Sequence, residues 1–506
     1  MRREADDQHG VRLMTNPDFR MLVGGQRVRA STGRELPAIN PFTGAEFAAI
    51  PDAGPQDVDA AVAAARAAFD GGWSTTPGVR RAELMHRLAA LVEEHADELG
   101  RLESADNGKL LRETTGQARF AARNYRFFAG YADKLCGRTI PLDNPDTLDY
   151  TVAEPIGVAA LITAWNSPMQ LLANKLAPAL AAGCCVVVKP SEHASATTLR
   201  MADLVERAGF PPGVINVVTG GPQAGIALTE HAGLDRISFT GSVPTGSAIA
   251  AAAAKNLVPV TLELGGKSPN IVFADADLDR AVTGAVAGIF AAGGQTCIAG
   301  SRLLVHESVY EQVVRAVAAR AAEIRLGDPA DPRTQMGPVA NGPQRDRIQR
   351  AIAAGVESGA RVLAGAGPVD DPALGEGLFV RPTVFADVAN TSALAREEIF
   401  GPVLSAIPFA DDDEAVAIAN DSDFGLASGI WTNDLTRAHR VAKRLRAGTV
   451  WVNTYRASAA QAPFGGTRKS GYGRERGEEA LHEYLSTKNV MVDLTGQTPD
   501  PFSIRL

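Results

Sequence analysis

The sequence GGQTCIAG, residues 293–300, places Cys297 among glycines and small polar residues that leave its thiol uncovered. Most free cysteines are buried packing residues, but a thiolate is also a strong nucleophile. Two further polar groups stand at the ends of predicted strands, namely Glu263 in LELGGK and Asn166 in AWNSP. A nucleophile, a carboxylate base and an amide donor to an oxyanion are the groups that acyl chemistry requires. These three residues are therefore the candidate catalytic set.

Two other turns could hold the parts of a dinucleotide. Lys189 and Glu192, in KPSE, follow a predicted strand, where they could bind the two hydroxyls of an adenosine ribose. Surface charge pairs of this kind are common, so an ordinary ion pair is an alternative. Gly241 and Gly246 stand between a strand and a helix, which is where open α/β sheets bind a pyrophosphate. Their spacing is not G-x-G-x-x-G, and a plain tight turn explains them equally well.

Strand and helix patterns alternate from residue 156 to residue 264 and position these polar groups. The strand patterns are rich in β-branched residues and bounded by Gly or Pro, whereas the helix patterns have apolar residues at helical spacing. Strict alternation predicts parallel βαβ units with right-handed crossovers, and hence an α/β fold. Strands are expected at 156–162, 184–190, 213–220, 235–242 and 259–266, and helices at 194–209, 224–233 and 245–256.

The remaining segments differ in character. Residues 55–135 are mostly amphipathic helix. Two extended pieces, 146–155 and 486–494, alternate polar and apolar residues without a neighbouring strand with which to pair. Another chain usually covers such an edge, so these pieces predict an oligomer. A second alternating region begins near 268–277, with helices expected at about 279–292 and 308–325 and strands near 379–385 and 403–408.

Length and charge exclude several classes of protein. With 506 residues, the chain is longer than one hydrophobic core supports, which predicts two or three domains. A formal net charge of −8 without a basic stripe argues against a nucleic-acid partner. The apolar stretches are too short to span a bilayer, and the N-terminal MRREADDQHGVRLMTN lacks the apolar core of a signal peptide. Four cysteines do not make a disulfide framework, and eight histidines show no ligand spacing, so we expect a cytoplasmic protein without a metal.

Seven motifs occur in the order AWNSP, KPSE, FTGS, LELGGKSPNIV, GGQTCIAGSR, EEIFGPV and PFGGTRKSGYGRE. This order resembles the aldehyde dehydrogenase superfamily, over a span from about residue 20 to residue 495. The resemblance implies a homodimer or homotetramer with three structural parts per chain. These are a Rossmann-like cofactor domain (1–135 and 156–263), an α/β catalytic domain (264–480) and a small β oligomerisation flap (136–155 and 481–506).

The resemblance also implies a reaction, the oxidation of an aldehyde to the free acid with NAD. Cys297 would attack the aldehyde carbon to give a thiohemiacetal, and Asn166 with the Cys297 backbone amide would stabilise the oxyanion. Transfer of hydride to the nicotinamide would leave a thioester, which water activated by Glu263 would hydrolyse. Glu475, in GRE, would relay protons from that base.

Further residues match the family's cofactor contacts. Lys189 and Glu192 match the adenosine-ribose contacts, Ser242 lies where the family binds pyrophosphate, and Glu398 matches the ligand of the nicotinamide ribose. A carboxylate at Glu192 would repel a 2′-phosphate, so NAD is expected in preference to NADP. The full cofactor-binding set that the resemblance implies is Trp165, Lys189, Glu192, Gly241, Ser242, Glu398 and Phe400.

The predicted substrate pocket departs from relatives that have aromatic walls. Ser167 follows Asn166, and Arg456 in NTYRASAAQAPF could pair with a carboxylate by a bidentate contact. The alternative is that Arg456 points to solvent, as most arginines do. We therefore predict an aldehyde with a polar or acidic far end, such as a semialdehyde. The predicted substrate residues are Ser167, Asn174, Tyr455, Arg456, Ser458 and Phe464.

Three other functions use some of the same residues. A coenzyme-A-acylating branch of the superfamily would pass the acyl group to CoA, but Glu263 supplies a base for water and favours the free acid. A thiol–imidazole hydrolase needs a histidine partner, and the nearest in sequence is His306, in RLLVHES. A catalytically silent structural homologue would not need to keep Cys297, Glu263 and Asn166.

Overall fold

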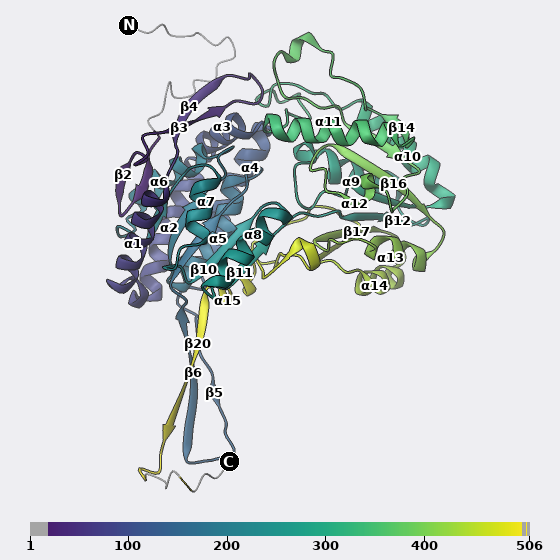
Figure 1. Ribbon diagram of the computed structural model, residues 1–506. Helices are drawn as coiled ribbons and strands as arrows, with labels where there is room; N and C mark the ends of the chain where they lie inside the picture. Colours follow the sequence, from purple (N-terminus) through teal and green to yellow (C-terminus); the bar gives the residue numbers. More distant parts are fainter. Residues whose placement is uncertain (1–18, 498–501, 503–506) are drawn as a thin grey trace, which may run out of the picture.

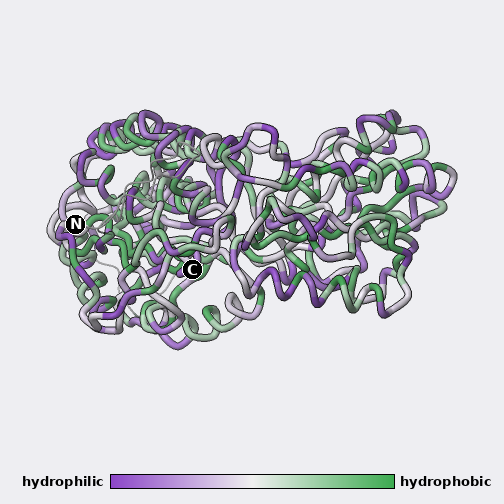
Figure 2. The backbone as a smooth tube through the Cα atoms, turned by 90° about the horizontal axis from the view of Figure 1, so that it is seen from above, coloured by the Kyte–Doolittle hydropathy of each residue, from purple (hydrophilic) through white to green (hydrophobic). Residues whose placement is uncertain are grey.

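The computed structural model describes residues 19–497 and residue 502. Residues 1–18 of the expected cofactor domain, and residues 498–501 and 503–506 of the expected flap, lie outside this description. The chain forms two α/β lobes that lie side by side, and a long β arm extends away from the first lobe (Figure 1). Seen from above, hydrophilic segments follow the outer rims of both lobes (Figure 2).

The first lobe contains an eight-stranded sheet in the order β19-β11-β10-β7-β8-β9-β1-β2. Its five central strands are parallel, and the chain order changes direction next to β7, which makes the carboxyl edge there a switch point. Every residue of β7, β8, β9 and β10 is buried, as a parallel sheet covered on both faces requires. The predicted α/β alternation is confirmed. The central strands are β7 (Val158–Ile162), β8 (Cys185–Lys189), β9 (Ile215–Val217), β10 (Arg236–Thr240) and β11 (Val260–Glu263).

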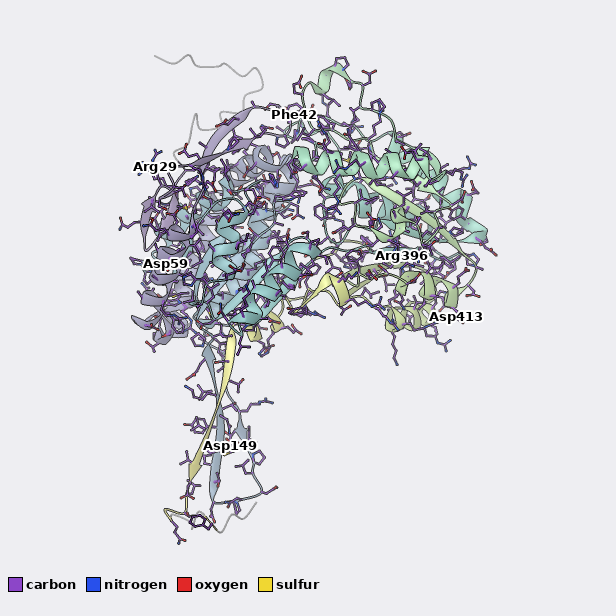
Figure 3. The ribbon with its side chains drawn as sticks, viewed as in Figure 1. Arg29, Phe42, Asp59, Asp149, Arg396 and Asp413 are labelled. Carbon is purple, nitrogen blue, oxygen red and sulfur yellow. The ribbon has the colours of Figure 1, made fainter. Side chains whose placement is uncertain are left out.

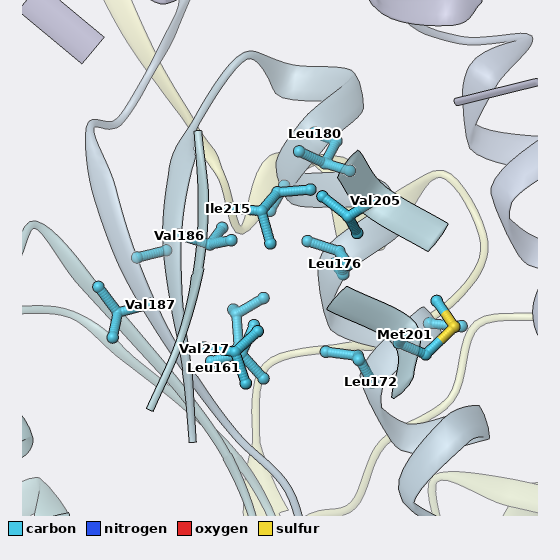
Figure 4. Close-up of a cluster of buried hydrophobic side chains, with 14 of the residues drawn as sticks. Leu161, Leu172, Leu176, Leu180, Val186, Val187, Met201, Val205, Ile215 and Val217 are labelled. Atoms are coloured by element: carbon cyan, nitrogen blue, oxygen red, sulfur yellow. The ribbon is translucent and has the colours of Figure 1, made fainter. Parts of the chain in front are cut away.

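Helices cover both faces of this sheet (Figure 1). On one face, leucines of α5 and apolar residues of α6 pack against valines and isoleucine of the central strands, as the close-up in Figure 4 shows. This packing fixes the loops at the carboxyl ends of the strands, where the polar motifs lie. The helices of the lobe are α1 (Pro55–Asp70), α2 (Gly78–Glu94), α3 (Ala96–Asn107), α4 (Leu111–Ala129), α5 (Pro168–Ala182), α6 (Ala196–Ala208), α7 (Pro222–Thr229) and α8 (Val243–Lys255).

The second lobe contains a seven-stranded sheet in the order β14-β15-β16-β13-β12-β17-β18. All neighbours are parallel except β14 and β15. Its strands are β12 (Pro269–Val272), β13 (Arg302–His306), β14 (Arg361–Ala364), β15 (Thr383–Ala386), β16 (Val403–Phe409), β17 (Ala427–Trp431) and β18 (Thr449–Val452). Its main helices are α9 (Leu278–Phe290), α10 (Tyr310–Ala322), α11 (Gly342–Glu357), α13 (Asp412–Asn420) and α14 (Leu435–Arg444), beside the short α12 (Ala393–Arg396).

The arm corrects one expectation. The two extended pieces that seemed to have no neighbouring strand pair with each other, as β6 (Thr147–Pro155) and β20 (Leu485–Asp493), antiparallel along their full lengths. The short strand β5 (Thr139–Ile140) covers the other edge of β6. Strands so far apart in sequence give no local signal of their pairing. Side chains of the arm, Asp149 among them, stand well apart from both lobes (Figure 3).

Short strands were missed by the periodicity argument. The strands β1 (Met21–Val23) and β2 (Gln26–Val28) extend the first sheet, and β3 (Glu35–Ile39) pairs with β4 (Glu46–Pro51). The strand β19 (Gly471–Tyr472) pairs with β11 in the first sheet, although its sequence falls inside the segment expected for the catalytic domain. Two residues are too few to show a period. Among the described helices, none is long and apolar enough to cross a membrane.

Candidate active site

Cys297 lies on a loop that follows α9 and is shaped by left-handed backbone. Ala292, Gly293 and Gly294 have φ angles of 54°, 60° and 70°. A Cβ atom on Gly294 would collide with the carbonyl group of Gly401, so only glycine lets the two segments approach this closely. The small residues around Cys297 are therefore explained by close backbone packing, and the thiol stays partly accessible.

The surroundings of Cys297 make ionisation of its thiol unfavourable. Burial, followed by the negative charges of Glu263 and Glu398, raises its pKa to about 12, and the positive charge of Arg476 opposes this rise. The thiol is thus protonated at neutral pH. A neighbouring base must take its proton before it can act as a nucleophile.

Asn166 lies in the loop between β7 and α5, facing the nucleophile loop. Its Nδ2 donates to the carbonyl oxygen of Gln295 at 3.0 Å. Since a side-chain amide has two N–H donors, one remains for an oxyanion. The connection between α3 and α4 holds the two neighbouring residues: Asn107 donates to the Trp165 carbonyl at 3.3 Å, and Lys109 to the Ser167 hydroxyl at 2.6 Å.

Glu263 ends β11 and is 3% exposed. Neither of its carboxylate oxygens has a hydrogen-bond partner among the described residues. Burial, followed by the charge of Glu475, raises the pKa of Glu263 well above its ordinary value. A Cβ atom on the following Gly266 would collide with the carbonyl oxygen of Cys297. Gly266 therefore lets the nucleophile loop approach the end of this strand.

A buried group of polar residues, which we call the base-side network, consists of Lys175, Glu475, Asn174 and Asn124. Lys175 forms an ion pair with Glu475 and also donates to the hydroxyl of Ser238 at 3.1 Å. The Asn174 amide donates to Glu475 at 3.3 Å and accepts from Asn124 at 2.7 Å. Asn174, expected at the substrate entrance, is instead buried in this network.

The adenosine-side residues lie at the carboxyl edge of the first sheet. Lys189 Nζ is 4.0 Å from a carboxylate oxygen of Glu192, at the end of β8. Ser242, next to Gly241, caps the N-terminus of α8 and is exposed, so the partial positive charge of that helix end is open to an anion. A Cβ on Gly246 would collide with Leu264, which shows how closely α8 packs on the sheet.

The nicotinamide-side residues come from both lobes: Glu398 and Phe400 from the second, and Trp165 from the first. Glu398 accepts a hydrogen bond from the Gly266 amide at 3.0 Å, and burial raises its pKa to about 7. A Cβ on Gly265 would collide with this carboxylate. Trp165 and Phe400 pack edge to face, with ring centroids 5.3 Å apart. The carboxylates of Glu192 and Glu398 fit the two riboses of a dinucleotide. The N-terminus of α8, which lies between them, fits its pyrophosphate.

Two predicted substrate residues contact the nucleophile loop. Tyr455 donates from its hydroxyl to the carbonyl of Ile298 at 3.0 Å, and its ring packs against Gly288 and Gly300, behind the loop. Arg456 is half-buried and donates to the carbonyl of Ala291 at 3.0 Å. Arg456 therefore points toward the nucleophile loop, and the solvent-facing alternative does not describe it.

Ser458 and Phe464, the other two predicted substrate residues of NTYRASAAQAPF, both contact Arg476, which was not predicted from the sequence. Arg476 donates to the hydroxyl of Ser458, and its guanidinium carbon lies 4.4 Å from the ring centroid of Phe464. Lys175 was also missed, although a single charge within LLANKLAPALAA is a signal of a buried partner. No pattern in the sequence marks the contacts of Arg476, because they depend on where its backbone directs the side chain.

The comparisons with known proteins agree with this geometry. Residues 28–490 match the model of the aldehyde dehydrogenase family. A (Z)-2-((N-methylformamido)methylene)-5-hydroxybutyrolactone dehydrogenase from Acinetobacter baylyi is 45% identical over 93% of this chain and 96% of its own length. A betaine aldehyde dehydrogenase from Brucella melitensis is 42% identical over 97% of this chain and 100% of its own. The structure of a betaine aldehyde dehydrogenase from Staphylococcus aureus in complex with NAD+ has a TM-score of 0.94 at 38% identity, covering 96% of this chain and 97% of that one. The chain is an enzyme of the aldehyde dehydrogenase family.

Proposed function

We propose that the chain oxidises an aldehyde to the free carboxylic acid with NAD, and that its preferred aldehyde has a polar or acidic far end, such as a semialdehyde. The observation that carries the reaction is the meeting of Cys297, Glu263 and Asn166 from three different loops. The polar side chains that lie near the nucleophile loop, Arg456 hydrogen-bonded to Ala291 and Ser458 hydrogen-bonded to Arg476, support the substrate class.

The first half of the reaction forms a covalent intermediate on the thiol. Glu263 takes the proton of Cys297 and passes it to the relay at Glu475, and the Cys297 sulfur bonds to the aldehyde carbon, giving a thiohemiacetal. The free N–H of Asn166 and the backbone amide of Cys297 stabilise the oxyanion. NAD, when bound, supplies the acceptor for the hydride that leaves this carbon. Cys297 is then left in a thioester.

The second half releases the acid. Glu263 takes a proton from water, and the hydroxide attacks the thioester carbon and expels the Cys297 thiolate. Glu263 has no hydrogen-bond partner among the described residues and a raised pKa, which suits this task because a raised pKa makes the carboxylate a stronger base. Glu475, held by Lys175, is the proposed relay that passes the proton onward.

The proposed cofactor contacts follow the two ends of the dinucleotide. Lys189 and Glu192 hold the adenosine ribose, Gly241 and Ser242 the pyrophosphate, and Glu398 the nicotinamide ribose. Trp165 and Phe400 flank the nicotinamide end. The S. aureus relative was solved with NAD+, which supports NAD here. Repulsion between Glu192 and a 2′-phosphate makes NADP the poorer cofactor.

The alternatives have weaker support. The position of Glu263 favours water over coenzyme A as the acyl acceptor. His306 ends β13 and has its Nδ1 2.8 Å from the Ser308 hydroxyl, so a role as the partner of Cys297 in a thiol hydrolase has no support. Intact catalytic residues argue against a silent homologue.

We propose a cytoplasmic homodimer or homotetramer that assembles through the arm. Free cysteines suit a reducing compartment. The arm exposes large apolar side chains, which a second copy of the chain would cover. These are Leu148, Tyr150, Val152, Met491 and Leu494.

The proposal is tested with a panel of aldehydes and NAD, recording the absorbance of reduced nicotinamide and ranking kcat/KM. A short semialdehyde is compared with a long alkanal of matched reactivity, and the semialdehyde is expected to be the better substrate. A clear preference for the alkanal contradicts the substrate class. No reduced nicotinamide with any aldehyde contradicts the reaction.

A further inference from the structure

Arg476 has no part in the mechanism above, yet its backbone is firmly held. Phe464 and Glu475 exchange two backbone hydrogen bonds of 2.7 Å, and Arg476 follows directly with a left-handed φ of 61°. A residue other than glycine in this conformation is uncommon and needs support from its surroundings. The backbone thus directs the Arg476 side chain back across Phe464.

The guanidinium of Arg476 is buried with a donor to spare. The residue is 6% exposed, and one terminal nitrogen donates to Ser458. Its Nε is buried and has no hydrogen-bond partner among the described residues. A buried donor without an acceptor is destabilising, so this nitrogen is suited to meet an acceptor that a ligand brings.

The charges around Arg476 leave its positive charge without a dedicated partner. Glu475 is already paired with Lys175 and accepts from Asn174. Burial, and then the charge of Glu475, raise the pKa of Glu263 well above its ordinary value, which favours the uncharged form of this carboxyl group. When Glu263 is protonated, one buried cation therefore lacks an anion.

Arg456, the sequence-based candidate for this role, has a different task. Its guanidinium donates to the Ala291 carbonyl, while Glu113 accepts from the next amide, that of Ala292, at 3.2 Å. The two side chains hold one peptide of the nucleophile loop from both sides. Their opposite charges also face each other, since the charge of Glu113 acts on Arg456.

We propose that Arg476 is the residue that binds the carboxylate of a short acidic aldehyde, with Ser458 and Phe464 orienting its guanidinium. The fork of N–H donors suits a carboxylate, and the closeness of Arg476 to the thiol requires a short spacer between the two ends of the substrate. This inference rests on the proposed function. It adds that the substrate of the enzyme is negatively charged and that Arg476 binds that charge.

The test compares 5-oxopentanoate with its methyl ester, which differ in charge but share the reacting aldehyde. The wild-type enzyme is expected to prefer the acid. Arg476→Gln should lower kcat/KM for the acid by roughly 30-fold more than for the ester, mainly through KM, because the loss of its charge near the Cys297 thiol affects both substrates alike. Arg476→Lys should keep part of the preference, and Ser458→Ala should lose a smaller part of it.

Binding of glutarate, measured by calorimetry, gives a readout that does not need turnover. Wild type should bind it more tightly than Arg476→Gln by a similar factor. The matched control is Arg456→Gln, which should lower kcat for acid and ester alike because it loosens the nucleophile loop. A loss of acid preference in Arg456→Gln with none in Arg476→Gln overturns the inference.

The remaining outcomes separate this inference from the proposal on which it rests. If Arg476→Gln slows acid and ester equally and shifts the pH profile, Arg476 acts through Glu263 and the inference is wrong, while an acid preference in wild type still stands. If wild type turns over both substrates but does not prefer the acid, the substrate class fails together with the inference. If neither substrate gives reduced nicotinamide, the proposed function itself fails.

Discussion

The two polar groups on either side of Cys297 are built from similar residues but differ in how their charges are balanced. In the base-side network, Lys175 and Glu475 neutralise each other, and Asn174 adds a further hydrogen bond. On the substrate side, Arg476 is also buried, and its Nε has no hydrogen-bond partner among the described residues. The first arrangement is complete within the chain, whereas the second is completed by a ligand. A buried ion pair whose charges cancel can hold a catalytic group in place. A buried cation without its own anion can select a substrate that brings one.

Replacing Cys297 removes the reaction but leaves both polar groups in place. Cys297→Ala should lower turnover by a factor on the order of 10⁴ or more, because no covalent intermediate can form. Dinucleotide binding should persist, since its proposed contacts lie on other loops. Steady-state rates together with a fluorescence titration with NAD check this expectation. Substantial turnover by the variant would remove Cys297 from its role.

After burial, the charges of both groups act on Glu263: the charge of Glu475 raises its pKa, whereas those of Lys175 and Arg476 lower it. Glu263→Gln should slow hydrolysis of the thioester by about 10²–10⁴-fold, so a burst of NADH should precede slow turnover. Because the pKa of Glu263 is raised, the wild-type hydrolysis rate should increase with pH as the carboxyl loses its proton. Rapid-mixing measurements across pH 5–9 should show this rise in wild type and its absence in the variant. Wild-type-like turnover by Glu263→Gln would show that another base operates.

Removing one charge from the balanced pair should destabilise the fold itself. Lys175→Met leaves the carboxylate of Glu475 buried without its partner, which should lower the free energy of unfolding by about 3–5 kcal/mol. The control is Lys175→Met with Glu475→Gln, where much of that stability should return. Urea unfolding measures both. Equal stability of wild type and Lys175→Met would mean that the pair is not as tightly coupled as its burial indicates.

Replacing Glu192, which belongs to neither group, should change only the preference for the cofactor. Glu192→Gln should narrow the preference for NAD over NADP by about tenfold, which corresponds to about 1.4 kcal/mol of removed repulsion. The ratio of kcat/KM with acid and ester substrates should stay as in wild type. Equal use of NAD and NADP by the wild-type enzyme would contradict the assigned role of Glu192, and Lys189 nearby offsets part of the repulsion.

The periodicity of apolar residues was sufficient to predict the alternating strands and helices of the first lobe. The alternation around β7, β8 and β10 gave the parallel sheet, because each strand and helix there is long enough to show its own period. The pairing of β6 with β20 was not predictable in this way, since the two strands are brought together only by the finished first lobe. The two-residue β19 was missed for want of any period at all.

The same division applies to the candidate site. Cys297, Glu263 and Asn166 were identifiable because each lies within three residues of a glycine or proline at a strand or loop boundary. The contacts of Asn174 and Arg476 were not, because burial and side-chain direction decide them. A helix residue that is read as facing an entrance can equally face the interior, and one sequence does not distinguish the two faces of a helix buried all round.

The crossing between the two sheets has a mechanical consequence. Residues 264–268 lead from β11 to β12, and they are buried along their whole length. The returning chain pairs as β19 beside β11, so the outgoing and incoming connections run next to each other. A hinge needs exposed backbone whose dihedral angles can change freely. Residues 264–268 do not offer it, whereas the returning segment, residues 453–470, contains many exposed residues. We therefore expect the outgoing crossing to stay rigid, and any relative motion of the two lobes to be accommodated by dihedral changes in residues 453–470.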